Sequence, residues 1–376
     1  MPKKGLVILG STGSIGRQTL DTVRAFPDSF EVVGLGAGNN ISLLKRQIDE
    51  FQPKLVWSSN NRLSLNSFGD SQITPMDEMV CDPATDTVMV GTTGRAGLIP
   101  TLKALDAGKS VCLANKEVII MAGEIISQMP KKIRTNLLPV DSEPSAIWQC
   151  LQGEDQPIRR LIITASGGPF RNTSEAELKT VTPEQALKHP TWTMGRRITI
   201  DSSTLMNKGF EVIEAHWLFE VDWHKIEVVV HPQSLIHSMV EFADGSVKAQ
   251  LGPPDMRLPI QYSLFYPDRH ANKDIPKLNI DVATNMTFEP MDPKRYPCFS
   301  LALHAGHQGA TFPTVLCAAD EVAVDLFLNR EIRFDDIPKV VGQTLEDHQP
   351  GNPNNLEEVL ASDEWARIRA REVAQK

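Results

Sequence analysis

Short apolar runs alternate with longer amphipathic stretches throughout residues 1–150. GLVIL is followed by SIGRQTLDTVRAF and FEVVGL by ISLLKRQIDEF, and the alternation continues through DTVMV, SVCLA and NLLPV. Apolar runs of about four to eight residues are typical of parallel strands covered on both faces, and amphipathic stretches of about 10 to 15 residues between them are typical of crossover helices. We therefore predict an α/β amino-terminal domain over residues 1–150, built on a doubly wound sheet.

The pattern changes in the next segment, which we predict to be an α+β domain over residues 151–265. A strand-like RRLIITA precedes a long polar loop over about residues 167–197, with a short helical pattern near residues 183–187. A helix is expected over residues 204–219. The runs IEVVV, LIHSMVEF and SVKAQL follow, and the last two are expected to pair as antiparallel strands of an open sheet around an Ala-Asp-Gly turn.

The last part of the chain has little strand pattern. Residues 266–297 are rich in Pro, Asp and Lys, as is typical of an irregular connector. Helical periodicity returns from residue 298 to residue 376 and predicts a small α-helical domain.

The composition excludes several classes of protein. The net charge is −9, so a polyanion-binding surface would have to be local, and nucleic acid is not expected as a partner. Five cysteines without a CxxC spacing exclude a fully paired disulfide framework and indicate a reducing compartment. No apolar run reaches the roughly 18 residues of a membrane span or forms the core of a signal peptide, so we expect a cytoplasmic protein without a membrane partner.

Three glycines, Gly10, Gly13 and Gly16, lie where the first predicted strand ends and the first helix begins. Glycines let the backbone turn tightly and approach a pyrophosphate, and the start of the helix supplies unbonded N–H groups. The motif GSTGSIG therefore predicts a dinucleotide-binding turn. A purely structural glycine turn is the alternative.

The end of the second predicted strand favours NADP(H) over NAD. NAD-specific domains carry a carboxylate about 20 residues beyond the glycines, whereas the sequence here is VVGLGAGNN. No carboxylate would repel a 2′-phosphate, and Asn39 or the backbone amides of residues 36–38 are expected to bind it.

Two carboxylates, Asp141 and Glu143, follow the predicted strand NLLPV. In an extended segment residues i and i+2 point to one side, about 6.5 Å apart, so both could bind one ion. Oxygen ligands without His or Cys neighbours favour Mg²⁺ or Mn²⁺. A solvated loop is the alternative, because an isolated Asp-x-Glu is common.

The segment DSSTLMNKGFEVIEA (201–215) offers groups suited to a phosphate and to a metal ion. We expect Ser202 in a loop of small hydroxyls, followed by Asn207 and Lys208 as donors for a phosphate monoester. Glu211 is a candidate third carboxylate ligand, and Glu214 shares its helix face. An amphipathic helix with a solvated acidic face is the alternative.

Two apolar side chains, Trp192 and Met194, lie in a polar, glycine-flanked segment without helical or strand periodicity. They are typical of the tip of a lid that excludes water when it closes. His189, in the same segment, is a candidate donor to a phosphate or a substrate hydroxyl. An incidental surface histidine is the alternative.

These segments together resemble one family, 1-deoxy-D-xylulose 5-phosphate reductoisomerase, over nearly the whole chain. The motifs occur in the order GSTGSIG, GAGNN, LANKE, VDSE, ASGGPF, HPTWTMG, DSSTLMNKGFEVIEA, HPQSLIHSMV and LGPPDMRLPI. The resemblance implies metal-dependent rearrangement and NADPH-dependent reduction of 1-deoxy-D-xylulose 5-phosphate to 2-C-methyl-D-erythritol 4-phosphate, in isoprenoid precursor biosynthesis. It also implies a homodimer.

The resemblance also implies roles for single residues. The metal ligands would be Asp141, Glu143 and Glu211, which with Lys116 would be the catalytic residues. The substrate would be bound by Ser142, Glu143, Ser166, His189, Ser202, Asn207, Lys208 and Glu211, under a lid formed by Trp192 and Met194. The cofactor would be bound by Thr12, Gly13, Ser14, Ile15, Gly38, Asn39, Asn40, Asn115, Glu117 and Gly195. Relatives are expected to carry a basic residue often at the position of Asn39, which is neutral here.

Three other functions share the predicted amino-terminal fold. An aldehyde dehydrogenase needs a nucleophilic cysteine, but Cys150 lies in the apolar helical stretch AIWQCLQ. A homoserine dehydrogenase would not need three carboxylates together with a phosphate clamp. A non-catalytic NADP-binding sensor would bind nucleotide without metal-dependent turnover.

Overall fold

The computed structural model describes residues 2–59, 71–192, 194–281 and 285–375. The chain divides into two compact units. The first unit comprises Met1–Val118, Gln128–Ser145 and Asp255–Pro276, and the second comprises Ile119–Ser127, Ala146–Pro254 and Lys277–Lys376.

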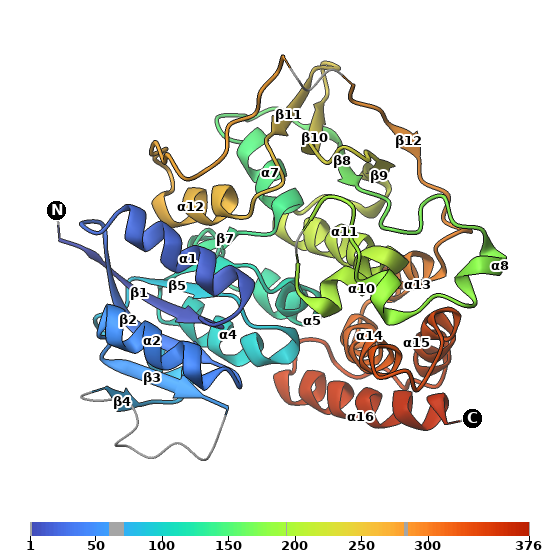
Figure 1. Cartoon of the computed structure of the whole chain (residues 1–376), viewed down its shortest axis with the longest axis horizontal. Coiled ribbons are helices and arrows are strands. Elements are labelled where there is room, and N and C mark those ends of the chain that lie inside the picture. The colour runs from blue at the N-terminus through green and yellow to red at the C-terminus, as the bar shows by residue number, and fades with distance from the viewer. Residues whose placement is uncertain (1, 60–70, 193, 282–284, 376) are drawn as a thin grey trace. The chain divides into compact units, whose positions relative to one another are not determined.

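The first unit is built on a seven-stranded sheet whose neighbouring strands are all parallel (Figure 1). The strand order is β4-β3-β2-β1-β5-β6-β7, so the direction of winding reverses between β1 and β5. In sheets of this kind ligands bind at the carboxyl ends of the strands beside that reversal. The strands are β1 (Lys4–Leu9), β2 (Phe30–Ala37), β3 (Leu55–Ser58), β4 (Gln72–Ile73), β5 (Thr87–Val90), β6 (Ser110–Leu113) and β7 (Leu137–Pro139).

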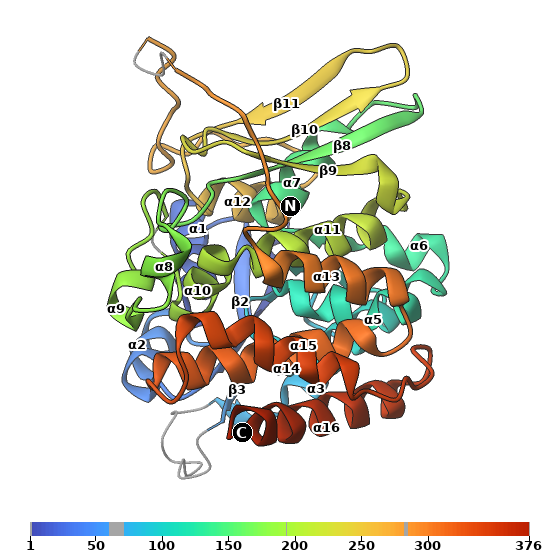
Figure 2. The same ribbon diagram turned by 90° about the vertical axis from the view of Figure 1, so that its right-hand side faces the viewer.

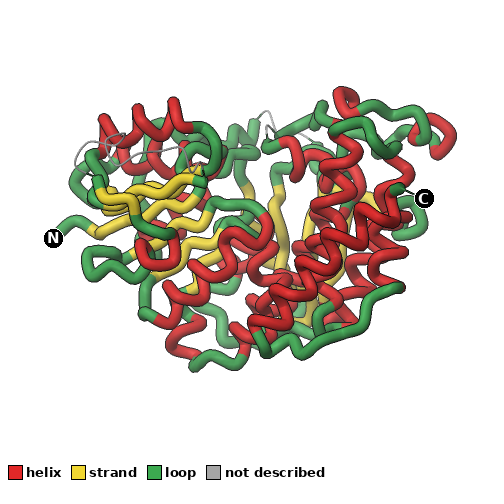
Figure 3. Tube along the Cα trace, turned by 90° about the horizontal axis from the view of Figure 1, so that it is seen from below, coloured by secondary structure: helices red, strands yellow, loops and turns green. Residues whose placement is uncertain are grey.

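Apolar residues on both faces of these strands explain why the sheet is parallel and fully covered. Leu6, Val7, Ile8 and Leu9 are consecutive and all completely buried, as expected where helices lie on both sides of a sheet (Figure 3). The helices that begin in this unit are α1 (Ser14–Ala25), α2 (Ile41–Phe51), α3 (Met76–Met79), α4 (Leu98–Asp106), α5 (Lys116–Ser127), α6 (Lys131–Arg134), α7 (Ser142–Cys150) and α12 (Arg257–Phe265).

The second unit contains a mixed five-stranded sheet in the order β11-β10-β8-β9-β12. β8 and β9 are parallel and the other pairs are antiparallel. Side chains of α7 and α11 pack against one face of this sheet around Leu161, Ile163 and Val240, and Figure 2 shows no helix over its other face among the described residues. The strands are β8 (Ile158–Ala165), β9 (Ile226–Val230), β10 (Ile236–Phe242), β11 (Val247–Leu251) and β12 (Glu289–Pro290).

The remaining elements of the second unit are helical. Helices α13 to α16 pack against one another at the carboxyl end of the chain, in orange and red in Figure 2. The helices are α8 (Glu175–Leu178), α9 (Pro183–Ala186), α10 (Arg196–Thr204), α11 (Met206–Phe219), α13 (Pro297–Gln308), α14 (Phe312–Leu328), α15 (Ile337–Glu346) and α16 (Leu356–Ala374).

The predicted fold class is confirmed: a doubly wound parallel sheet, a second mixed sheet with an open face and a helical carboxyl-terminal region. The antiparallel pairing of β10 with β11 is also as expected. The boundaries of the four predicted segments stay predictions; residues 255–276 belong to the first unit. No helix of the described residues is both long and apolar enough to span a membrane.

Candidate active site

The turn between β1 and α1 requires glycine at specific positions. Gly10 has a φ of 84°, and a Cβ at Gly16 would lie 2.4 Å from the carbonyl oxygen of Gly10 and 2.4 Å from the Cα of Ser11. Both are backbone atoms, so a side chain would force the turn open. The residue that precedes α1 is Gly13, which has no side chain to cap the helix, so the first amides of α1 suit an anion.

The next turn along the sheet edge, at Gly38 to Asn40, follows β2, the parallel neighbour of β1. Asn40 caps α2, because its Oδ1 accepts a hydrogen bond from the Leu43 amide at 3.2 Å. The Oδ1 of Asn39 accepts from the Ser59 hydroxyl at 3.2 Å. The turn carries no carboxylate, in agreement with a site for NADP(H).

Asn115 and Glu117, at the start of α5, hold the loop after β5. The Asn115 amide donates to the carbonyl of Gly94 at 2.9 Å and to the Thr92 hydroxyl at 3.1 Å. Glu117 accepts from the Gly94 amide at 3.3 Å. Both side chains position a loop at the ligand edge of the sheet, and their contact with a cofactor stays a prediction.

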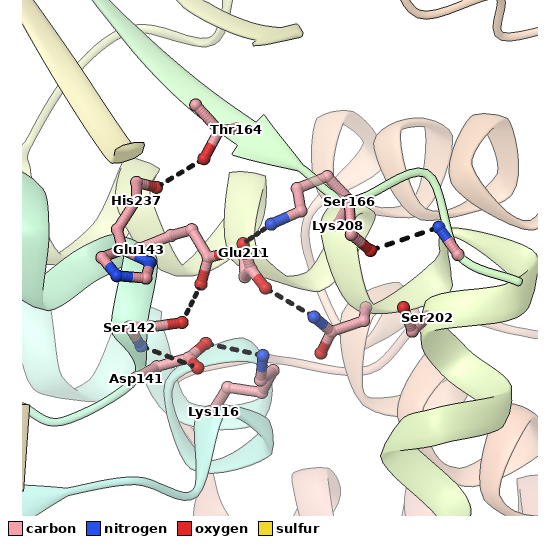
Figure 4. Close-up of polar contacts among 12 residues, drawn as sticks. Lys116, Asp141, Ser142, Glu143, Thr164, Ser166, Ser202, Lys208, Glu211 and His237 are labelled. Atoms are coloured by element: carbon pink, nitrogen blue, oxygen red, sulfur yellow. Dashed lines mark hydrogen bonds and ion pairs between the residues drawn. The ribbon is translucent and has the colours of Figure 1, made fainter. Parts of the chain in front are cut away.

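Asp141 of the first unit is buried and paired with a lysine. Its Oδ2 lies 2.6 Å from the Nζ of Lys116, and the two side chains are 11% and 6% exposed. Its Oδ1 accepts from the Ser142 amide at 3.1 Å, and the Ser142 hydroxyl donates to Glu143 (Figure 4). The predicted extended conformation is wrong, because α7 begins at Ser142. Glu143 and Pro144 in the first turn are the sequence signals that could have indicated this helix.

Glu211 of the second unit is buried on α11 between two donors of the same helix. The Asn207 amide donates to its Oε1 at 2.5 Å, and the Lys208 ammonium pairs with its Oε2 (Figure 4). The spacings of four and three residues place both donors on the face that carries Glu211. The predicted hydroxyl loop is wrong, because Ser202 lies on α10, and Leu205, with a φ of 56°, separates α10 from α11.

His189 of the second unit lies between two serine hydroxyls. Its Nε2 is 3.1 Å from the Oγ of Ser166 and 3.1 Å from the Oγ of Ser202. Its Nδ1 accepts from the backbone amides of Thr191 and Trp192 at 3.2 and 2.9 Å, which assigns the ring proton to Nε2. Burial lowers the pKa of His189 to about 4, so the ring is neutral at pH 7.

The predicted lid segment continues from His189. Trp192 is half-buried, and its ring lies 5.9 Å from the ring of His237 between centroids. Met194 is half-buried and Gly195 precedes α10. Sequence reasoning did not identify His237, because its approach to Trp192 depends on tertiary packing and no spacing in the sequence indicates it.

Asp141 and Glu143 of the first unit and Glu211 of the second are carboxylates that could each offer an oxygen ligand to a metal ion. The set contains only carboxylate oxygens. Mg²⁺ and Mn²⁺ prefer oxygen ligands, whereas zinc sites are typically built with His or Cys. Two of the three carboxylates are paired with a buried lysine, so positive charge is already matched to these oxygens.

A dinucleotide turn on a parallel sheet, together with an all-oxygen metal group, defines the class of a metal-dependent, nucleotide-dependent oxidoreductase. Family models agree along the chain: "1-deoxy-D-xylulose 5-phosphate reductoisomerase" matches residues 6–123, its C-terminal domain matches residues 137–219, and "DXP reductoisomerase C-terminal domain" matches residues 251–369. The chain belongs to the 1-deoxy-D-xylulose 5-phosphate reductoisomerase family.

Curated relatives and solved structures of this family match over the full length. The reductoisomerases of Prosthecochloris aestuarii and Pelotomaculum thermopropionicum are 51% and 49% identical to the chain; the matches cover 97% of the chain in both cases and 98% and 97% of the relatives. The structure of the Zymomonas mobilis enzyme in complex with NADPH has a TM-score of 0.90 and 40% identity, with complete coverage of both chains. A reductoisomerase in complex with NADPH, fosmidomycin and magnesium has a TM-score of 0.94 and 35% identity, covering 99% of this chain and 98% of the other.

Cys150 does not have the properties of a catalytic nucleophile. It is the last residue of α7 and is 5% exposed. Burial raises the pKa of its thiol to about 11, so the thiolate is scarce at neutral pH. An aldehyde dehydrogenase that acts through this cysteine is therefore excluded.

Proposed function

We propose that the chain converts 1-deoxy-D-xylulose 5-phosphate to 2-C-methyl-D-erythritol 4-phosphate with NADPH and a divalent cation held by Asp141, Glu143 and Glu211. The chain is an NADPH-dependent oxidoreductase of isoprenoid precursor biosynthesis by its family, and the group of three carboxylates is the observation that carries the metal assignment. Magnesium and NADPH are present in a structure similar over 99% of this chain.

The turn at Thr12 to Ile15 fits the pyrophosphate of NADPH. A Cβ at Gly10 would meet the carbonyl oxygen of Gly91 at 2.4 Å, so only a bare backbone fits beside β5. The amides at the start of α1 would donate to the phosphate oxygens. The remaining proposed contacts are made by Gly38, Asn39, Asn40, Asn115, Glu117 and Gly195. When bound, NADPH supplies the hydride.

The carboxylates fit a hard cation because all three offer anionic oxygen atoms, the donors that Mg²⁺ and Mn²⁺ prefer. When bound, the cation polarises the substrate carbonyl and stabilises negative charge on oxygen. Lys116 and Lys208 hold Asp141 and Glu211 in place, and Ser142 orients Glu143 through its hydroxyl. We propose that Lys116 and Ser142 also contact the substrate.

The substrate phosphate is proposed to bind to donors of the second unit. The neutral His189 presents an N–H at Nε2 beside the hydroxyls of Ser166 and Ser202. Asn207 and Lys208 add an amide and a positive charge. The substrate phosphate would therefore be bound by one positively charged group, Lys208, and by several neutral hydrogen-bond donors.

Trp192 and Met194 are proposed to close over the bound substrate and to exclude water. We further propose a homodimer, supported by apolar side chains on the face of the second sheet that none of the described helices covers. Met239 and Ile162 are cross-strand neighbours there, and Val247 is 50% exposed. Sedimentation analysis would detect the dimer.

The cytoplasm is the proposed compartment, because none of the five cysteines forms a disulfide.

The proposed activity is tested by following NADPH oxidation with 1-deoxy-D-xylulose 5-phosphate as the substrate. We expect turnover with Mg²⁺ or Mn²⁺, loss of turnover after chelation with EDTA, and recovery when the metal is restored. A metal-free protein that oxidises NADPH at an unchanged rate would contradict the metal assignment. Nucleotide binding without turnover under any metal condition would instead indicate an NADP-binding sensor.

A further inference from the structure

A cavity of about 560 Å³ lies between helices α1 and α2 of the first unit. Ser14, the first residue of α1, lines it, so the cavity opens beside the turn proposed for the pyrophosphate. Three arginines also line the cavity, Arg17 and Arg24 from α1 and Arg46 from α2. Ser14 belongs to the dinucleotide turn, but neither the sequence motifs nor the proposed reaction assigns a role to the three arginines.

Among the described residues, carboxylates neutralise only one of the three arginines. Arg24 donates to Asp21 at 2.6 Å and to both oxygens of Glu50 at 2.6 and 2.8 Å, and the hydrogen bond from Arg24 lowers the pKa of Glu50. Asp21 and Glu50 are the two carboxylates that line the cavity. Arg17 donates to the neutral carbonyl of Gly13 at 3.3 Å, and Arg46 makes no ion pair with any residue that the structure describes. Within the part of the chain that the structure describes, the charges of Arg17 and Arg46 are therefore not balanced by a carboxylate.

Helix α2 is fixed to the dinucleotide turn next to one of these charges. The Gln47 side chain donates to the carbonyl of Ser11 at 2.9 Å and accepts from its hydroxyl at 2.9 Å, and both residues are buried. Arg46 precedes Gln47 and follows Asn40 by six residues, which is about 9 Å of helix at about 1.5 Å per residue. Helical side chains lean toward the N-terminus, so a guanidinium at this position can approach a group held at Asn39 and Asn40.

We propose that Arg17 and Arg46 bind the 2′-phosphate of NADPH and thereby set the preference for NADPH over NADH. The inference rests on the NADPH site of the proposed function. Asn39 and Asn40 are neutral, so their side-chain amides can donate hydrogen bonds to a phosphate but supply no positive charge. A phosphate dianion needs positive charge, and a guanidinium supplies it in a geometry that matches two phosphate oxygens.

Fluorescence titration of NADPH and of NADH tests this assignment without a need for turnover. We expect Arg46→Ala and Arg17→Ala each to weaken NADPH binding about tenfold, since hydrogen bonds to charged groups are among the stronger ones, and to leave NADH binding unchanged. Arg46→Lys keeps the charge without the planar fork and should fall between Arg46→Ala and the wild type. The ratio of kcat/KM for the two nucleotides should change in parallel.

Two control variants separate a local role from a general effect of charge. Lys45→Ala removes the same charge from the same helix at a position that does not line the cavity, and Arg24→Ala removes the arginine that is already paired. Neither should change the ratio of NADPH to NADH affinity. An equal loss of both affinities in Arg46→Ala, or unchanged NADPH affinity in the Arg17→Ala/Arg46→Ala double variant, would overturn the inference. A wild-type protein that binds neither nucleotide would overturn the proposed function as well.

Discussion

Each unit of the molecule contains a buried carboxylate paired with a buried lysine, but the two pairs are built differently. In the first unit Lys116 and Asp141 lie 25 residues apart in the sequence, after the neighbouring parallel strands β6 and β7. In the second unit Lys208 and Glu211 lie three residues apart on α11. The first pair depends on the packing of a sheet, whereas the second depends on the period of one helix.

The difference shows that a buried carboxylate can be paired with a lysine either through tertiary packing or through the spacing within one helix. A pair on one helix persists as long as that helix forms. A pair that joins the ends of two strands is lost whenever the strands separate. Variants of the four residues therefore distinguish an effect on chemistry from an effect on the fold.

The largest expected effect is that of Glu211→Gln. The substitution keeps the size of the side chain and removes the charge of one proposed metal ligand, so kcat should fall by about 10³-fold or more. NADPH affinity, measured by fluorescence, should stay nearly unchanged. Asp141→Asn should have the same effect although its lysine comes from a different part of the chain. Full activity in either variant would contradict the metal assignment, and the exposed Glu227→Gln on β9 provides the control.

Substitutions of the two lysines should change different kinetic parameters. Lys208→Ala is expected to raise the KM for the substrate about 10- to 100-fold with a smaller change in kcat, because its proposed role is binding of the phosphate. Lys116→Ala is expected to lower kcat with a smaller change in KM. Each variant leaves a carboxylate buried without its lysine, so the free energy of unfolding should fall by about 3–5 kcal/mol in the absence of metal. Identical kinetic changes in the two variants would refute the distinction.

The smallest expected effect is that of His189, in the second unit, on the pH dependence of the free energy of unfolding. Its pKa of about 4 is below the ordinary value of 6.5, so the unfolded chain takes up a proton before the folded chain does. Its contribution to stability is therefore complete above pH 6.5 and is lost as the pH falls toward 4. Chemical denaturation of wild type and of His189→Gln across this range isolates the effect from that of His348, whose pKa burial also lowers. If the stabilities of the wild type and of His189→Gln changed in parallel with pH, the contribution assigned to His189 would be contradicted.

The sequence pattern predicted the first sheet well because its central strands are largely apolar runs, interrupted in β2 by the exposed Glu31. It did not predict β4, which has two residues, or α12, whose Pro259 is atypical of a helix interior. The helix α10 was missed because RRITIDSST contains β-branched and small polar residues of low helix propensity, and tertiary packing decides its conformation.

The sequence motifs name the residues of the proposed site, whose roles stay predictions, but they did not give its local geometry. The positions of Asp141, Glu143 and Glu211 came from motifs, yet the extended conformation assumed for Asp141 to Glu143 was wrong. The pairing of Lys116 with Asp141 could not be derived from spacing, because it depends on the register of β6 and β7. By contrast, Lys208 and Glu211 follow helical spacing and needed only the helix to be recognised.

The hydrogen bonds at Nδ1 of His189 limit what this ring can do. Two backbone amides, those of Thr191 and Trp192, are directed at that nitrogen. A proton relay needs one ring nitrogen to release a proton while the other accepts one, and here the accepting nitrogen is already engaged. The imidazole can therefore orient an anion as a fixed donor, and any proton exchange with bulk solvent during turnover has to pass through other groups.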